Sequence, residues 1–71
     1  MTYRIDGYPD TAEGVIALID EARRTGAWPS NIRGDALHTI CYSNEQDPSL
    51  SPEEAQAWAR AETHLRSRSR A

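Results

Sequence analysis

The chain has no phenylalanine and no lysine, and its 71 residues include one cysteine, Cys41. A single cysteine excludes a disulfide bond within the chain, and the absence of a paired cysteine framework is typical of a reducing compartment. The sequence shows neither the basic and apolar start of a secretory signal peptide nor an apolar run of the ~18 residues that a membrane span needs. We therefore predict a cytoplasmic protein that does not enter a membrane.

Large aliphatic side chains are scarce as well. Ten are present: Ile5, Val15, Ile16, Leu18, Ile19, Ile32, Leu37, Ile40, Leu50 and Leu65. The net charge is only −3, so the chain is expected to fold rather than to remain disordered. A core this small is usually supplemented by a disulfide, a metal ion or association. We therefore expect one small domain, residues 1–71, that associates with itself or with a partner.

Charge is unevenly distributed along the sequence. Residues 1–62 carry all eleven Asp and Glu side chains against five Arg, whereas residues 63–71 carry three Arg and no acidic side chain. An acidic body repels nucleic-acid phosphates and attracts a basic protein surface. The charge pattern therefore favours a protein partner over a nucleic acid.

Two segments have both the period and the end signals of α-helices. Residues 11–25 repeat apolar side chains at helical spacing, and Gly26 follows as a left-handed C-cap. Residues 51–67 begin with Ser51 as N-cap and a proline at the first helical position, and Glu54 completes a capping box. Both helices are predicted mainly from local sequence.

A third helix is predicted at residues 30–43, with Ser30 as its N-cap. Residues 37–42 are also rich in strand formers, and the alternating segment 2–6 would be their natural partner. The main prediction is an all-α, three-helix domain, and the alternative is an α+β fold with a short two-stranded sheet from residues 2–6 and 37–42. The all-α prediction divides the chain into an extended arm at 1–9, helices at 11–25, 30–43 and 51–67, and a flexible tail at 68–71.

No pattern indicates catalysis. His38 and Cys41 are three residues apart on one helical face, but structural zinc needs four ligands and no further pair has the appropriate spacing. As a nucleophile and base, the same two residues would need an orienting group and a pocket. The sequence also lacks a glycine-rich phosphate loop. We predict no enzymatic activity, no metal and no cofactor.

A nucleic-acid-binding function is the first alternative. The helix at 11–25, the turn at Gly26 and the helix at 30–43 resemble a helix-turn-helix. The residues that would contact nucleic acid are Asn31, Arg33, Arg66, Arg68 and Arg70. Asp35 occupies a position where a buried aliphatic residue is expected, and the pI near 5.2 is unlike that of DNA-binding modules.

Protein binding has more support. Trp28 lies in a connection beside Pro29, and Trp58 lies on an alanine-rich helix with few large neighbours. Aromatic side chains that exceed the needs of a core tend to become interface anchors. The predicted rim that would steer a basic partner consists of Asp20, Glu21, Glu45, Asp47, Glu53 and Glu54.

The sequence thus predicts a small acidic module that acts stoichiometrically, as an inhibitor or adaptor, by binding a larger and basic protein. In size, acidity and lack of catalytic residues it is similar to the small inhibitor and adaptor proteins of bacteriophages and mobile elements, including anti-CRISPR proteins and DNA mimics. That similarity implies Trp28, Trp58 and the acidic rim as the binding surface. A homodimer and a purely structural self-association module remain open.

Overall fold

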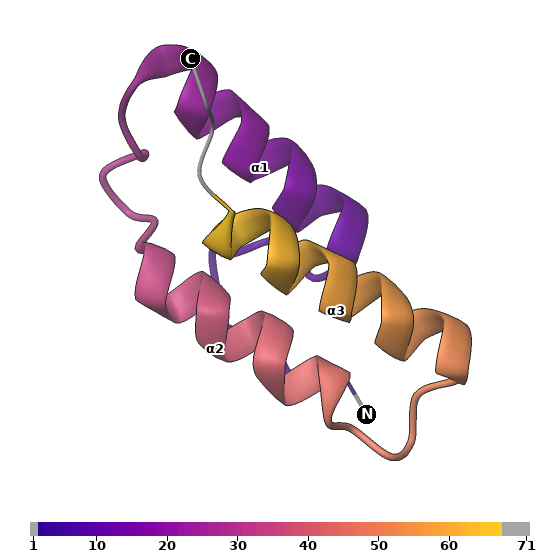
Figure 1. Ribbon diagram of the computed structural model, residues 1–71. Coiled ribbons are helices and arrows are strands. Elements are labelled where there is room, and N and C mark those ends of the chain that lie inside the picture. The colour runs from indigo at the N-terminus through magenta and orange to yellow at the C-terminus, as the bar shows by residue number, and fades with distance from the viewer. Residues whose placement is uncertain (1, 68–71) are drawn as a thin grey trace.

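Three α-helices account for most of residues 2–67, the part of the chain that the computed structural model describes (Figure 1). They are α1 (Ala12–Thr25), α2 (Gly34–Glu45) and α3 (Pro52–Arg66). No strand occurs in this range, so the all-α prediction is confirmed and the α+β alternative is wrong. Residues 37–42 lie inside α2, where Leu37, Ile40 and Cys41 are fully buried. Their spacing buries one helical face, and this outweighs the strand propensity of the segment.

Helix α3 is the central element of the fold. It packs against both α1 and α2, whereas α1 and α2 make little contact with each other. The helices α1 and α3 run in the same direction, because the carboxylate of Asp20 lies 2.7 Å from Nε2 of His64 and Arg23 donates to the His64 carbonyl at 2.6 Å. The loop at 46–51 returns the chain, so that α2 is antiparallel to α3 (Figure 1).

The core lies where α3 meets its two neighbours. Its buried members are Ala12, Val15, Ile19, Ile32, Leu37, Ile40, Cys41, Trp58 and Ala61. Ile5, Tyr8, Ile16, Leu18, Leu50, Ala57 and Leu65 pack against them with part of their surface exposed. All ten large aliphatic side chains therefore belong to the core or pack against it.

One buried side chain of α2 binds the backbone of the arm that precedes α1. Asn44 is completely buried; its Oδ1 accepts a hydrogen bond from the Tyr3 N–H at 2.6 Å, and its Nδ2 donates to the Tyr3 carbonyl at 3.0 Å. This pair of bonds imitates the exchange between two β-strands, with an amide side chain in place of the second strand. Segment 2–6 therefore finds its backbone partner on α2 and needs no sheet.

The ends of α1 and α3 follow the local signals. Thr11 caps α1 by accepting a hydrogen bond from the Gly14 N–H at 3.0 Å. Gly26 ends it with φ 83°, a left-handed conformation that costs other residues about 1–2 kcal/mol. Ser51 and Glu54 form the predicted capping box at the start of α3.

The start of α2 differs from the prediction. The helix begins at Gly34 rather than near Ser30, and it extends two residues beyond 43. Ile32 belongs to the connection, where it is buried in the core and donates its N–H to the Pro29 carbonyl. The arm contributes here, because the Tyr8 hydroxyl accepts the Arg33 N–H at 3.1 Å just before the helix begins. A hydrogen bond from a distant segment thus holds the residue that precedes α2, and α2 has no side-chain cap of its own.

None of the helices in residues 2–67 combines the length and the apolar character that crossing a membrane requires. The predicted flexible tail, 68–71, lies outside the described residues.

Candidate functional site

A groove of about 310 Å³ lies between the beginnings of α1 and α3. Its lining includes four carboxylates and one guanidinium: Asp10, Glu13, Glu53, Glu54 and Arg60. Leu50, Ala57 and the edge of Trp58 provide apolar surface between them. The parallel arrangement of α1 and α3 produces this grouping, because each helix begins with acidic residues. We call this site the acidic groove.

The acidic groove keeps an excess of negative charge after its own compensation. Carboxylates in the first turn of a helix offset a macrodipole charge of about +0.5, and two such helix ends meet here. Together with Arg60, the helix ends offset about half of the four negative charges. The remaining charge is available to a cation from outside.

The predicted acidic rim is divided between two ends of the molecule. Glu53 and Glu54 line the acidic groove, and Glu45 and Asp47 lie close by in sequence, at the end of α2 and in the loop that leads to α3. Hydrogen bonds from the Ser49 N–H and hydroxyl lower the pKa of Asp47, so its carboxylate stays charged.

The other two rim residues lie near the C-terminal end of α1. Asp20 contacts His64, and Glu21 forms a salt bridge with Arg24. Glu21 is therefore compensated by a cation within the chain, and Asp20 is hydrogen-bonded to the His64 ring. Asp20 and Glu21 lie in the second half of α1 and do not line the acidic groove, so the structure does not bring the six predicted residues together on one surface.

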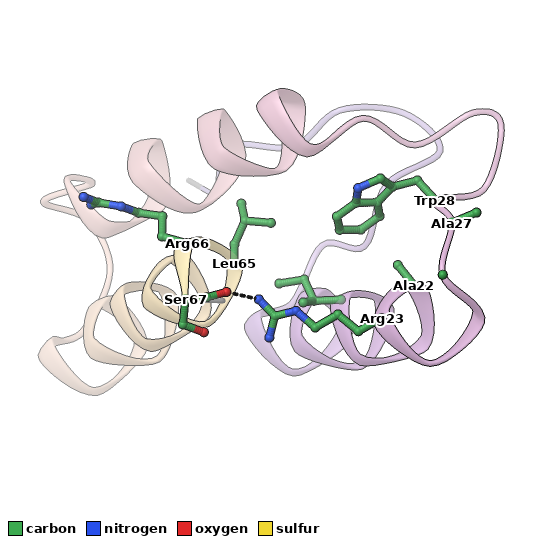
Figure 2. Close-up of a pocket in the computed structure, with 9 residues that line it drawn as sticks. Ala22, Arg23, Ala27, Trp28, Leu65, Arg66 and Ser67 are labelled. Carbon is green, nitrogen blue, oxygen red and sulfur yellow. Dashed lines mark hydrogen bonds between the residues drawn. The ribbon is translucent and has the colours of Figure 1, made fainter. Parts of the chain in front are cut away.

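A second groove, of about 550 Å³, lies at the opposite end, between the last turns of α1 and α3 and the connection that carries Trp28 (Figure 2). Its lining includes Ile19, Ala22, Ala27 and Leu65. Trp28 is 38% exposed and projects over this surface (Figure 2). We call this site the tryptophan groove. It places Trp28 away from the acidic groove, so the two cannot form a single small interface.

Arginine side chains border the tryptophan groove without filling it. Arg23 donates hydrogen bonds to the carbonyls of His64 and Ser67, and so ties α1 to the end of α3. Arg66 points away from Trp28 (Figure 2), with Nη1 3.7 Å from the carboxylate of Glu62. The tryptophan groove therefore combines apolar and polar surface, with Arg23 and Arg66 at its border.

The assignment of Trp58 as an interface anchor is wrong. Only 4% of Trp58 is exposed, and it packs in the core with Ala61 and the buried residues of α2. An alanine-rich helix leaves space for one large side chain, and the neighbouring helices close around it. Trp58 is therefore a core residue that also lines the acidic groove with the small part of its surface that is exposed.

The residues of the nucleic-acid alternative do not form one surface on a recognition helix. Asn31 and Arg33 precede α2, and Arg33 lies 3.5 Å from the carboxylate of Asp35. A helix-turn-helix requires two helices packed together across a short turn, but α1 and α2 barely touch. Arg66 belongs to α3, and Arg68 and Arg70 lie outside the described residues.

The pair His38 and Cys41 does not form a reactive site. Cys41 is fully buried, and burial, followed by the charges of Glu62 and Glu45, raises its pKa to about 11. The sulfur is a neutral thiol at physiological pH and a weak nucleophile. Nδ1 of His38 lies 3.1 Å from the Glu62 carboxylate. Among residues 2–67, no three His, Cys, Asp or Glu side chains are arranged to hold a metal ion.

Sequence reasoning missed Glu62, which is only 6% exposed. It lies four residues after Trp58 and one after Ala61, within the apolar stripe of α3. An acidic residue in such a stripe is the signal that predicts a buried carboxyl group with partners on a neighbouring helix.

No family model, no curated protein and no solved structure matches this chain.

Proposed function

We propose that the chain is a protein-binding module that docks its acidic groove onto a basic surface of a larger protein, as an inhibitor or adaptor. The supporting observation is the gathering of four carboxylates around apolar surface at one end of the molecule. A positive potential on the partner would accelerate association with the acidic groove. The apolar residues between the carboxylates, Leu50 and Ala57, would add contact area.

The chemistry of the acidic groove favours an arginine-bearing segment. Arginine combines a long apolar stem with a planar cation that forms paired hydrogen bonds with carboxylates. In the acidic groove the stem would pack on Leu50 and Ala57, while the guanidinium would meet Glu13 or Glu53. Binding of an arginine side chain in this way needs both the apolar and the acidic residues that line the acidic groove.

The test compares two double variants that each remove two negative charges. Glu13→Gln with Glu53→Gln neutralises the acidic groove, and Asp20→Asn with Glu21→Gln neutralises the opposite end. We expect the partner, captured from a lysate of the source organism and then purified, to bind the groove variant at least about tenfold more weakly than the wild type, a loss of about 1.4 kcal/mol. The other double variant should bind almost as tightly as the wild type.

Salt and nuclease separate this function from the alternatives. Binding through the acidic groove should weaken as the ionic strength rises, since the Debye length falls from about 30 Å at 0.01 M to about 3 Å at 1 M. Nuclease should have no effect. Capture that disappears with nuclease, or equal losses in the two double variants, would contradict the proposal.

A further inference from the structure

The tryptophan groove plays no part in the proposed function, and its charge is opposite to that of the acidic groove. Within residues 2–67 its lining includes two arginines, Arg23 and Arg66, and no acidic side chain. The apolar part of the lining lies under Trp28 (Figure 2) and includes Ile19, Ala22 and Leu65. A volume of about 550 Å³ lies within the range of about 300–1,000 Å³ that is usual for ligand pockets.

Trp28 is positioned by the connection between α1 and α2. The left-handed Gly26, with φ 83°, turns the chain out of α1 before Trp28, and Pro29 follows it. One edge of the indole lies beside Gly34, the first residue of α2, because a Cβ at Gly34 would meet Cζ2 of Trp28 at 3.9 Å. The indole is therefore supported at one edge, and 38% of Trp28 remains exposed to a ligand.

Arg23 supplies a guanidinium group that is already oriented at the groove. Its Nη2 donates to the carbonyls of His64 and Ser67, so the group is anchored on the end of α3. The N–H groups of Nε and Nη1 make no hydrogen bond within residues 2–67. A guanidinium forms paired hydrogen bonds with a carboxylate, and an oriented one loses less conformational entropy on binding. Arg23 is therefore suited to an acidic side chain.

The charges around the tryptophan groove favour an acidic protein segment over a nucleic acid. Arg66 is 72% exposed, the Glu62 carboxylate 3.7 Å away offsets part of its charge, and Arg68 and Arg70 follow Ser67 in the sequence. A nucleic acid is bound by a row of cations along its phosphates. The groove itself has two arginines, and the whole chain has a net charge of −3. One or two carboxylates match this arrangement better.

We propose that the tryptophan groove is a second docking site, which binds a segment of another protein that combines acidic side chains with a large aliphatic one. The aliphatic side chain packs on Ile19 and Leu65 beside Trp28, and a carboxylate accepts hydrogen bonds from Arg23. Because the two grooves lie at opposite ends, one chain holds an acidic and a basic partner together. The second site does not depend on the proposed function of the acidic groove.

The test is an NMR titration of the isotope-labelled chain with acetylated and amidated tetrapeptides. The probe is Asp-Leu-Leu-Asp. The controls are Asn-Leu-Leu-Asn, which lacks the charges, and Asp-Ala-Ala-Asp, which lacks the large side chains. The indole N–H resonance of Trp28 should shift with the probe, while that of the buried Trp58 should not. Each control should bind at least about fivefold more weakly, because it loses one of the two kinds of contact.

Variants of the lining locate the binding. Trp28→Ala and Arg23→Gln should each weaken binding of the probe at least about tenfold. Because Arg23 also ties α1 to α3, Arg23→Lys is measured beside it; the lysine keeps the charge but not the paired donors, so binding should weaken about threefold. The matched control Arg24→Gln removes a cation from the same turn of α1 outside the lining, and should change affinity by less than about twofold. Equal losses in Arg23→Gln and Arg24→Gln would overturn the proposal.

The same titration distinguishes other occupants of the tryptophan groove. A Trp28 indole resonance that shifts with protein concentration, without a response to the probe, would show that a second copy covers the groove and would overturn the proposal. Tighter binding of a single-stranded oligonucleotide than of the probe would overturn it in favour of a nucleic acid. The double variant Glu13→Gln with Glu53→Gln should bind the probe at least as tightly as the wild type, so the two grooves are tested separately.

Discussion

Trp58→Ala is expected to leave much of the chain unfolded at room temperature. Trp58 is 4% exposed and belongs to the core where α3 meets its neighbours. Replacing a buried tryptophan by alanine usually costs about 3–5 kcal/mol, because contacts are lost and a cavity remains. At about 0.05–0.15 kcal/mol per residue, a chain of 71 residues has a total stability of about 4–10 kcal/mol. The expected cost of Trp58→Ala is therefore about as large as the lower estimates of the total stability.

Far-ultraviolet circular dichroism and urea unfolding measure this loss, and Trp28→Ala is the matched control. Trp28 is 38% exposed, so the same substitution should cost only about 1–2 kcal/mol and should leave the helical content unchanged. Equal losses in the two variants would contradict the distinction between a core tryptophan and a surface tryptophan. An unfolded Trp28→Ala chain would also remove Trp28 from the candidate binding residues.

Asn44→Ala is expected to destabilise the fold by about 2–3 kcal/mol and to release the arm. The substitution removes two hydrogen bonds to the Tyr3 backbone, each worth about 1 kcal/mol, and opens a small cavity at a fully buried position. Hydrogen exchange should show faster exchange at the Tyr3 amide, and at the Tyr8 amide if the arm is released as a unit. Urea unfolding gives the loss in stability.

Two further substitutions sharpen this test. In Asn44→Asp the carboxylate still accepts from the Tyr3 N–H but cannot donate to the Tyr3 carbonyl, and it places a charge in the core. It should destabilise the fold more than Asn44→Ala does. The control Asn31→Ala changes an exposed residue of the connection and should alter stability by less than about 0.5 kcal/mol. An arm that remains protected in Asn44→Ala would mean that apolar packing, rather than the amide, holds it.

Helix positions were predictable from sequence where the signals are local. The capping box of Ser51 and Glu54, and Gly26 after α1, each involve residues within one turn of a helix end. The start of α2 could not be obtained in this way, because the Tyr8 hydroxyl that meets the Arg33 N–H is 25 positions away in the chain. The partner of segment 2–6 was hidden for the same reason, since Asn44 is 41 positions from Tyr3.

The candidate site was predictable as a set of residue types but not as a surface. Charge alone identified Glu53 and Glu54, but only the parallel arrangement of α1 and α3 brings them beside Asp10 and Glu13. No local pattern in the chain separates Asp20 from these residues. Its partner, His64, is 44 positions away.

The central position of α3 also bears on how the chain is made. During synthesis, α1 and α2 leave the ribosome before the helix that joins them, and they have little contact with each other. The apolar faces around Val15 and Leu37 therefore stay uncovered until α3 is complete. A nascent or truncated chain that ends before residue 52 would be a substrate for chaperones and proteases rather than a smaller folded unit.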